Sequence, residues 1–235
     1  MLYGVTSSLR EPGAEFDRQV QNLLGRGYPE LAGTTADEFE RLVAPLRPAA
    51  IAGGAAMDSP TPARVPFVLV VTKNLLTADQ MMPLTTLAGG RTPGVVDRNF
   101  SDGELSRFNP IKELGVSEGK AYLVFDIDRG EEFLNVTPND AVAAITARQR
   151  TPLTWEEGVA LVTQFPASLE KNKCFSLAGS RCGDRRVPAL WISQRAPKLG
   201  WCWAGNPHTW LGTASSSRRS HTAADPTPPP IMKLG

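Results

Sequence analysis

Residues 171–212, KNKCFSLAGSRCGDRRVPALWISQRAPKLGWCWAGNPHTWLG, decide the fold. This stretch holds all 3 cysteines of the chain, four of its 5 tryptophans and one of its 2 histidines. Within it, three short runs bounded by turns that contain Gly, Arg and Pro are typical of strands: 174–178, 187–193 and 198–203. We therefore predict an antiparallel β-meander here, with its second turn at 194–197.

Two buried strands are predicted upstream of the meander. Residues 65–72, VPFVLVVT, are β-branched and bounded by turn signals, and residues 121–128, AYLVFDID, form the second strand. Helical periodicity and capping signals predict helices at 15–24, at 37–44, and after Thr137 and Thr154. The predicted fold class is α+β, with N-terminal helices and a mixed sheet whose C-terminal part is the meander.

The chain divides by composition into four parts. Residues 1–47 form a predicted N-terminal helical segment, and residues 48–64, rich in Ala, Gly and Pro, form a linker or long loop. Residues 65–212 form the α+β domain. Residues 213–235 contain three consecutive serines, three consecutive prolines and little apolar content, which predicts a disordered tail that is dispensable for stability.

The overall composition is that of a globular protein. A chain of 235 residues with 41% hydrophobic and 21% charged residues can bury a sizeable core. The longest apolar runs are too short to span a bilayer, and no basic region followed by an apolar stretch marks a secretory signal, so we expect no membrane partner. An odd number of cysteines argues against a disulfide framework and favours a reducing, cytoplasmic compartment.

Charge is spread unevenly along the chain. Residues 171–219 contain nine basic side chains and one acidic side chain, Asp184, which gives a formal charge of +8. Because the whole chain carries +1, the remainder carries −7. A basic end on an acidic body points either to an anionic ligand or to neutralisation within the fold.

The loop between the first two strands of the meander combines glycines with arginines. Glycine backbone N–H groups and guanidinium groups together can hold a phosphate or a carboxylate. The candidate ligand-binding residues are Arg181, Gly183, Arg185, Arg186, Trp201 and Trp203. The loop lacks the G-x-x-x-x-G-K-[ST] pattern of a P-loop, and the alternative is a solvated turn whose arginines pair with the acidic body.

The cysteines and one histidine support two further hypotheses. The thiolates and imidazole of a tetrahedral zinc site could come from Cys174, Cys182, Cys202 and His208, but the C-x7-C-x19-C-x5-H spacing lacks the close C-x2-C pair of zinc ribbons. Cys182 could also be a catalytic nucleophile, with its pKa lowered by neighbouring arginines and with His208 as the base. The competing explanation is that the cysteines pack in the core as small apolar residues.

Tryptophans interleaved with basic residues suggest a binding surface. Trp201 and Trp203 share one face of a predicted strand, and Trp191 is a candidate to join them. Such surfaces can stack the bases of single-stranded nucleic acid, but the near-neutral net charge of the chain disfavours a nucleic-acid partner. Core packing is the simpler explanation for these tryptophans.

Carboxylates gather at the end of the second upstream strand. Asp126 and Asp128 share one strand face and are followed by Glu131 and Glu132, so they could hold Mg²⁺. The pattern fails as an EF-hand because Gly130 stands where a ligand is required. A polar strand end that turns into solvent is the favoured interpretation.

Three segments carry a resemblance to a known family. Residues 170–212, together with RGEEFLNVTP at 129–138 and PFVLVVTKN at 66–74, resemble an actinobacterial family of uncharacterised proteins, a domain of unknown function. The resemblance covers most of residues 15–212. Because that family has no assigned activity, the resemblance implies no catalytic residues; it implies a bacterial, cytoplasmic protein.

The leading hypothesis is that the protein binds a small anionic ligand, bearing phosphate or carboxylate, at residues 179–186. One alternative is an enzyme that uses Cys182 or a Cys/His metal site. Another is a non-catalytic interaction protein that uses a Trp-rich surface. The sequence leaves open the identity of the ligand, the presence of an enzymatic activity and the oligomeric state.

Overall fold

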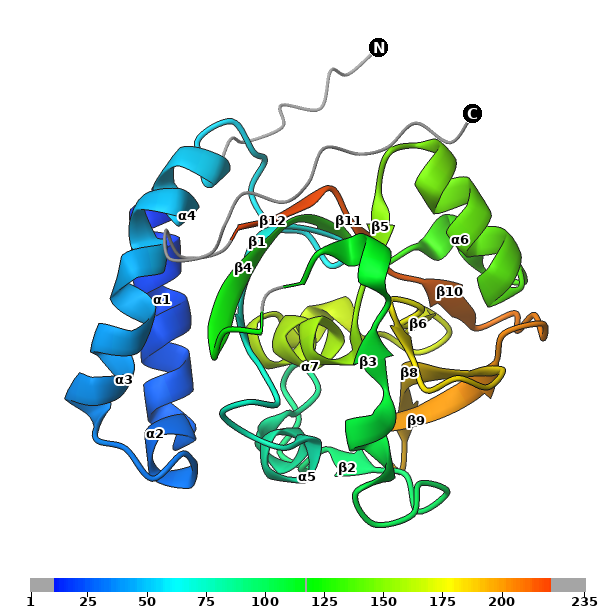
Figure 1. Ribbon diagram of the computed structural model, residues 1–235, viewed down its shortest axis with the longest axis horizontal. Helices are drawn as coiled ribbons and strands as arrows, with labels where there is room; N and C mark the ends of the chain where they lie inside the picture. Colours follow the sequence, from blue (N-terminus) through cyan, green and yellow to red (C-terminus); the bar gives the residue numbers. More distant parts are fainter. Residues whose placement is uncertain (1–10, 117, 221–235) are drawn as a thin grey trace.

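The computed structural model describes residues 11–116 and 118–220 (Figure 1). The α-helices are α1 (Pro12–Gly25), α2 (Tyr28–Leu31), α3 (Ala36–Val43), α4 (Arg47–Gly54), α5 (Ala78–Met81), α6 (Pro138–Ala147) and α7 (Trp155–Gln164). Short 3-10 turns are η1 (Ala44–Leu46), η2 (Met82–Leu84), η3 (Glu104–Arg107), η4 (Lys112–Leu114), η5 (Glu131–Phe133) and η6 (Pro166–Ser168). The strands are β1 (Arg64–Val71), β2 (Val95–Val96), β3 (Asn109–Pro110), β4 (Ala121–Asp128), β5 (Thr151–Pro152), β6 (Cys174–Ser176), β7 (Ser180–Arg181), β8 (Arg186–Ser193), β9 (Ala196–Trp203), β10 (Leu211–Thr213), β11 (Ser215–Ser216) and β12 (Arg218–Ser220).

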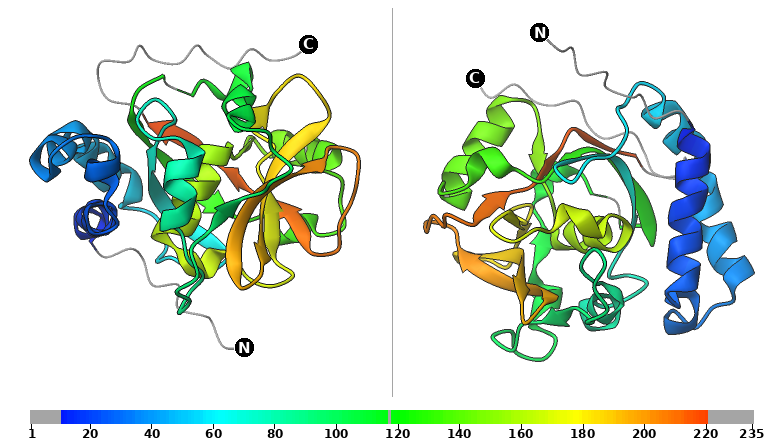
Figure 2. Two further views of the ribbon diagram at one scale, coloured as in Figure 1. Left: turned by 90° about the horizontal axis from the view of Figure 1, so that it is seen from below. Right: turned by 180° about the vertical axis from the view of Figure 1, so that it is seen from behind.

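The elements stack in layers around the central helix α7. The N-terminal helices α1 to α4 cover one face of the sheet that contains β1 and β4, and α7 packs on the other face (Figures 1 and 2). The sheet that contains β6, β8 and β9 lies on the far side of α7. The α+β class predicted from the sequence, with helices first, is confirmed.

The first sheet is built on a long antiparallel pair. β1 pairs with β4 so that Phe67 lies opposite Phe125, with 6.0 Å between the ring centroids. Every residue of β1 after Arg64 is buried, because helices cover both faces of this sheet. The sequence of a strand that is covered on both faces is a continuous run of apolar residues, and residues 65–71 show this pattern.

The outer edge of β1 is closed by a side chain of α1. Gln19 is fully buried; its Nε2 donates to the Phe67 carbonyl oxygen at 3.0 Å, and its Oε1 accepts from the Leu69 N–H at 2.7 Å. The amide thus occupies the hydrogen-bonding positions of a neighbouring strand. This arrangement satisfies the polar groups of a sheet edge that would otherwise be buried without partners.

The second sheet contains the meander. Its strand order is β10-β6-β8-β9-β2; β6, β8 and β9 are antiparallel, whereas β10 and β2 are parallel to their neighbours. The hairpin between β8 and β9 turns at Gln194 and Arg195, which both have positive φ, as a two-residue turn of type I′ requires. The predicted meander within a mixed sheet is therefore present.

All ten residues of the central helix α7 are buried. The predicted capping box begins it, because the Glu157 N–H donates to Thr154 Oγ1 at 3.2 Å and the Thr154 N–H donates to Glu157 Oε2 at 2.8 Å. Glu157 Oε1 also accepts from the Tyr122 hydroxyl at 2.8 Å and from Arg219 Nε at 2.6 Å. Glu157, in the first turn of α7, is thus bonded to β4 through Tyr122 and to β12 through Arg219, two strands that pair with each other in the first sheet.

The neighbouring carboxyl, Glu156, should make stability depend on pH. Glu156 is 3% exposed, and burial raises its pKa, although it accepts the Lys73 N–H at 2.8 Å. The folded state therefore binds the proton more tightly than the unfolded state, so stability falls as pH rises from the usual value of 4.5 through the raised pKa. Glu156→Gln keeps an acceptor for Lys73 and should stabilise the protein at pH 7, because it removes a buried negative charge.

Urea denaturation of this variant and the wild type at pH 4 and pH 7 measures the effect. The gain should disappear at pH 4, where both states hold the proton. Glu113→Gln, at an exposed position, is the matched control and should change stability at neither pH. An equal gain at both pH values would show that the charge of Glu156 is not responsible.

Two predicted boundaries are wrong. Residues 48–64 are not a linker throughout, because Arg47–Gly54 forms α4. Residues 213–220 are not a disordered tail, because they complete β10 and form β11 and β12. One large buried cluster runs from Phe16 in α1 to Ala214 after β10, so the helical segment and the sheets share a core. The remainder of the predicted tail, 221–235, lies outside the described residues.

Candidate anion-binding site

The Gly/Arg loop connects β7 to β8 at one end of the second sheet. Arg181 lies on β7, which pairs with β3 so that Arg181 is opposite Asn109. Arg186 begins β8 and lies opposite Trp203 on β9. Between them Gly183 has φ 91° with open space where a Cβ would lie, so it allows the tight turn.

Arg186 is already neutralised by two carboxylates. Its Nη2 is 2.7 Å from Glu104 Oε1, and its Nε is 2.8 Å from Asp184 Oδ2. The guanidinium also lies over the rings of Phe108 and Trp201, at 5.6 and 5.5 Å from their centroids. The hydrogen bond that Arg186 donates to Glu104 is the main cause that raises the pKa of Arg186. Arg186 is thus a structural cation. Glu104 and Phe108, which surround it, were not among the residues predicted from the sequence to lie at this loop.

Arg181 has a different environment. It is half-buried, and within residues 11–116 and 118–220 it forms no ion pair. Its Nη1 is buried and has no hydrogen-bond partner among the described residues. Burial lowers the pKa of Arg181, and the nearby Cys202 and Cys182 thiols act in the opposite direction. A buried guanidinium nitrogen without an acceptor is a candidate contact for an anion.

The predicted pair of tryptophans is present beside this loop. Trp201 and Trp203 meet edge to face with 4.8 Å between centroids, and the Arg185 guanidinium lies 5.7 Å from the Trp203 centroid. Trp203 is 42% exposed, whereas Trp201 Nε1 is buried and lacks a hydrogen-bond partner among the described residues. Among the described residues, three buried side-chain polar atoms have no hydrogen-bond partner: Arg181 Nη1, Trp201 Nε1 and Ser168 Oγ. The first two belong to predicted ligand-binding residues.

Trp191 does not join this pair. On β8 it lies opposite Lys198, on the other face of the sheet, and covers Gly200. Its ring meets Trp210 at 6.4 Å, and Trp210 in turn meets the His208 ring at 5.3 Å. The two aromatic groups therefore lie on opposite faces of the β8–β9 hairpin.

The cysteines and His208 are not gathered into one site. Within the described part of the chain, no group of three or more His, Cys, Asp or Glu side chains is placed to hold a metal ion. Cys174 and Cys202 are buried, and burial raises the pKa of both thiols, that of Cys202 to about 12. Their surroundings suit small apolar residues of the core.

Cys182 is half-buried, and its thiol is not activated. Burial and a hydrogen bond to Asp184 raise its pKa, and Arg186, whose Nη2 is 3.9 Å from the sulfur, opposes this only weakly. Arg186 acts on this pKa in the predicted direction, but the net shift of the Cys182 pKa is upward. His208 lies against Trp210, and no hydrogen bond joins it to Cys182 among the described residues.

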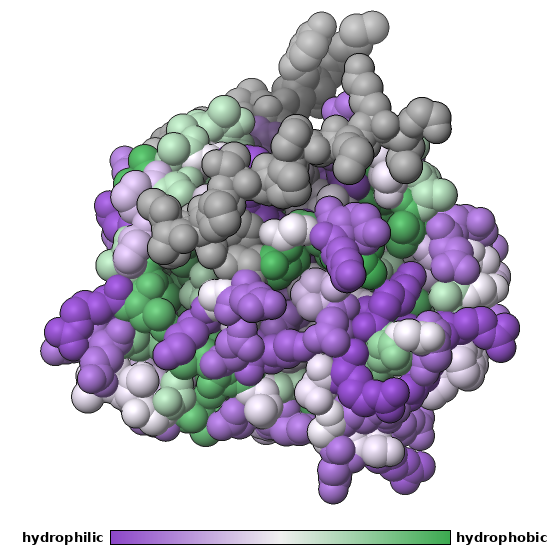
Figure 3. All heavy atoms as spheres, viewed as in Figure 1, coloured by the Kyte–Doolittle hydropathy of each residue, from purple (hydrophilic) through white to green (hydrophobic). Residues whose placement is uncertain are grey.

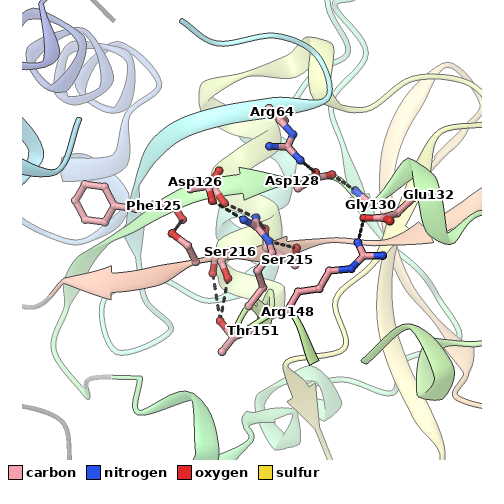
Figure 4. Close-up of polar contacts among 12 residues, drawn as sticks. Arg64, Phe125, Asp126, Asp128, Gly130, Glu132, Arg148, Thr151, Ser215 and Ser216 are labelled. Atoms are coloured by element: carbon pink, nitrogen blue, oxygen red, sulfur yellow. Dashed lines mark hydrogen bonds and ion pairs between the residues drawn. The ribbon is translucent and has the colours of Figure 1, made fainter. Parts of the chain in front are cut away.

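The carboxylates at the end of β4 are bound by arginines (Figure 4). Asp126 forms an ion pair with Arg150, and Asp128 pairs with Arg64 at 3.0 Å while also accepting the Gly130 N–H at 2.8 Å. These contacts hold the strand end in place and leave the two carboxylates committed to protein partners. The arrangement favours the structural interpretation over a magnesium site.

The exposed surface offers little for the interaction-protein alternative. The large apolar side chains that are exposed among the described residues are Leu31, Ile51, Val95 and Trp203, each on a different element. Hydrophilic residues predominate on the face shown in Figure 3. Within the described residues, no helix has the length and apolar character needed to cross a bilayer.

Comparison with known proteins identifies the family of the chain. A family model described as a family of unknown function (DUF5701) matches residues 22–222. The chain belongs to this family. No curated protein and no solved structure matches the chain. The DUF5701 match continues past the predicted boundary at residue 212 and includes β11 and β12, which agrees with their place in the first sheet.

Proposed function

We propose that this DUF5701 protein binds a small anionic ligand through Arg181, at the junction of β7 and the loop 182–185. The observation that supports this most is the buried Nη1 of Arg181, which has no acceptor among the described residues. A buried donor without a partner costs about 1–3 kcal/mol, and more when it is charged. A bound anion would remove that cost with charge-assisted hydrogen bonds.

Two further features support the proposal. The Trp201 Nε1 donor, on β9 of the second sheet, is likewise buried without an acceptor among the described residues. The formal charge of +8 on residues 171–219 is partly neutralised by ion pairs such as Lys198 with Asp97 and Arg219 with Glu157, whereas Arg181 has no carboxylate partner among the described residues. The alternative of an enzyme that uses Cys182 is less well supported. The raised pKa of the Cys182 thiol disfavours the thiolate that nucleophilic catalysis requires.

We also propose that the protein is bacterial, of actinobacterial origin, and cytoplasmic. The support for the origin is the resemblance of residues 170–212 to an actinobacterial family. The support for the compartment is the odd number of cysteines, all three of them free.

Thermal denaturation with a panel of simple anions tests the binding proposal. At about 100 times the dissociation constant, phosphate or a carboxylate should raise Tm by roughly 5–10 °C through mass action. Arg181→Gln should abolish the rise. Without anion this variant should be as stable as the wild type or more so, because it removes a partly buried, unpaired cation.

Arg91→Gln is the matched control, since Arg91 is exposed and forms no ion pair among the described residues. It removes the same formal charge and should retain the full rise in Tm. A panel without any stabilising anion would refute the proposal, and a rise that persists in Arg181→Gln would place the site elsewhere.

A further inference from the structure

We infer that the ligand of this site carries a doubly charged phosphoryl group, and that Lys73 supplies the second positive charge that holds it. The inference rests on the proposed function, because it takes Arg181 as the first of the two cations. It follows from the pairing of β3 with β7, which places Arg181 beside Asn109, the residue that binds Lys73.

Asn109 lies directly beside Arg181. The two residues are opposite each other in the antiparallel pair of β3 and β7, so their side chains share one face, with about 4.5–5.5 Å between the Cβ atoms. Ser180, the residue before Arg181, is fully buried, and its Oγ accepts the Trp155 N–H at 3.1 Å. Because side chains alternate along a strand, Arg181 and Asn109 lie on the opposite, outer face, where Asn109 is exposed.

Lys73, two residues after β1, is bound to the same asparagine. Its Nζ donates to Asn109 Oδ1 and to the Ser106 carbonyl oxygen, which are both uncharged acceptors. The lysines that form ion pairs within residues 11–116 and 118–220 are Lys173 and Lys198, so Lys73 has no carboxylate partner there. An ammonium group has three N–H donors, so one donor of Lys73 remains for a ligand.

A neighbouring carboxyl group, that of Glu156, contacts the backbone of Lys73 and not its ammonium group. Glu156 Oε1 accepts the Lys73 N–H at 2.8 Å. Burial raises the pKa of Glu156, which favours its uncharged form. Lys73 and Arg181 are therefore two cations beside one asparagine, and neither forms an ion pair in the part of the chain that the structure describes.

The groups around Asn109 are donors. Arg181 Nη1 is buried without an acceptor among the described residues, and Asn109 Nδ2 uses one of its two N–H groups on the Arg107 carbonyl oxygen at 3.2 Å. A phosphate monoester presents three acceptor oxygens and a charge of about −1.5 to −2 at pH 7, which Arg181 and Lys73 together can balance. A carboxylate carries one charge and needs only one of these cations. The site is accordingly suited to a phosphate monoester.

Calorimetric titration with phenyl phosphate and benzoate at pH 7.5 tests the inference, because the two probes share a ring and differ in the head group. Wild-type protein should bind phenyl phosphate at least about tenfold more tightly than benzoate. Lys73→Gln should weaken phenyl phosphate binding by about tenfold or more and benzoate binding by less than about threefold, since Arg181 alone balances a carboxylate. Lys112→Gln, at an exposed position in η4, is the matched control and should change both affinities by less than about twofold.

A second variant acts on the same site without removing Lys73. Asn109→Asp keeps an oxygen acceptor for the Lys73 ammonium group and places a negative charge beside both cations. It should weaken phenyl phosphate binding by at least about tenfold, and by more than it weakens benzoate binding. If Lys73→Gln does not fold, Asn109→Asp and the wild-type comparison of the two probes still decide the inference.

The outcomes separate the inference from the proposed function. Benzoate binding as tightly as phenyl phosphate in the wild type, with both lost in Arg181→Gln, would overturn the inference and leave anion binding at Arg181 intact. An unchanged phenyl phosphate affinity in Lys73→Gln would likewise exclude Lys73 as the second cation. No binding of either probe to the wild type would overturn both the inference and the proposed function.

Discussion

Replacing Arg219 with Met should destabilise the protein by about 3–5 kcal/mol. Arg219 lies on β12, its side chain is 4% exposed, and it forms a two-point contact with Glu157, which is fully buried. It also donates to Thr151 Oγ1 at 2.7 Å and to the Pro152 carbonyl oxygen at 3.1 Å. Methionine fills a similar volume but leaves a buried carboxylate without its cation, which is the costly half of breaking a buried ion pair.

The neighbouring residue provides the control. Arg218 is exposed, and its guanidinium stacks 3.9 Å from the Phe125 ring centroid, so Arg218→Met should cost about 1 kcal/mol. The double variant Glu157→Gln and Arg219→Met should be more stable than Arg219→Met alone, because the unpaired charge is gone. Urea denaturation measures all of these. A loss in Arg219→Met no larger than in Arg218→Met would show that the buried pair contributes little.

Strand β12 and its ion pair could not be predicted from the sequence. The strands β11 and β12 are two and three residues long, rich in serine and arginine, and show no apolar period. They form because Ser215 pairs with Asp128 and Arg219 with Val124, almost a hundred residues earlier. Strand propensity and hydrophobic periodicity are local signals. A short strand that forms only because it pairs with a distant strand therefore cannot be predicted from them.

Elements with strong local signals were predicted well. The strand predicted at 65–72 corresponds to Arg64–Val71, and the one at 121–128 to Ala121–Asp128. The helices predicted from capping signals at 37–44 and after Thr154 are present, and capping boxes at Thr35 and Thr154 begin them. These signals succeed because they depend on residues within one turn or one strand, where the sequence is the whole cause.

Helix α4 was missed for a reason that lies in its packing. Its sequence, RPAAIAGG, contains the glycines and proline of a typical loop. In the structure a Cβ on Gly53 would overlap the Phe125 ring, and one on Gly54 would come within 2.9 Å of Pro12. The glycines that weaken the helical signal are the ones that let α4 approach the sheet and α1, so tertiary packing overrides propensity here.

In the candidate site too, local features could be predicted from the sequence and long-range contacts could not. The sequence placed the arginine loop and the strand of Trp201 and Trp203 within one predicted meander, and in the structure β8, which follows the loop, pairs with β9, which carries the two tryptophans. It could not distinguish Arg186 from Arg181, because the carboxylate that neutralises Arg186 is Glu104, on a distant 3-10 turn. Pairing between charges far apart in the chain decides which arginine is available to a ligand.

Replacing Gly130 with Ala should destabilise the protein by more than about 3 kcal/mol, or prevent folding. Gly130 follows β4 with φ 78°, a left-handed conformation that costs a non-glycine residue about 1–2 kcal/mol. A Cβ at this position would also overlap the backbone carbonyl of Thr213 in β10. Because the obstacle is backbone, relief requires moving β10 away from β6, with which it pairs.

Two matched variants separate the clash from the backbone conformation. Gly89 has φ 69° and nothing within 4 Å of a built Cβ, so Gly89→Ala should show only the left-handed cost, about 1–2 kcal/mol. Gly212 lacks a positive φ, but its Cβ would overlap the Gly130 carbonyl oxygen, so Gly212→Ala should show the clash alone. Urea denaturation should therefore rank the losses as Gly130→Ala, then Gly212→Ala, then Gly89→Ala. If Gly130→Ala and Gly89→Ala lose the same free energy of unfolding, β10 can move away from Gly130 at little cost. The close contact between Gly130 and β10 would then not be important for holding the two sheets together.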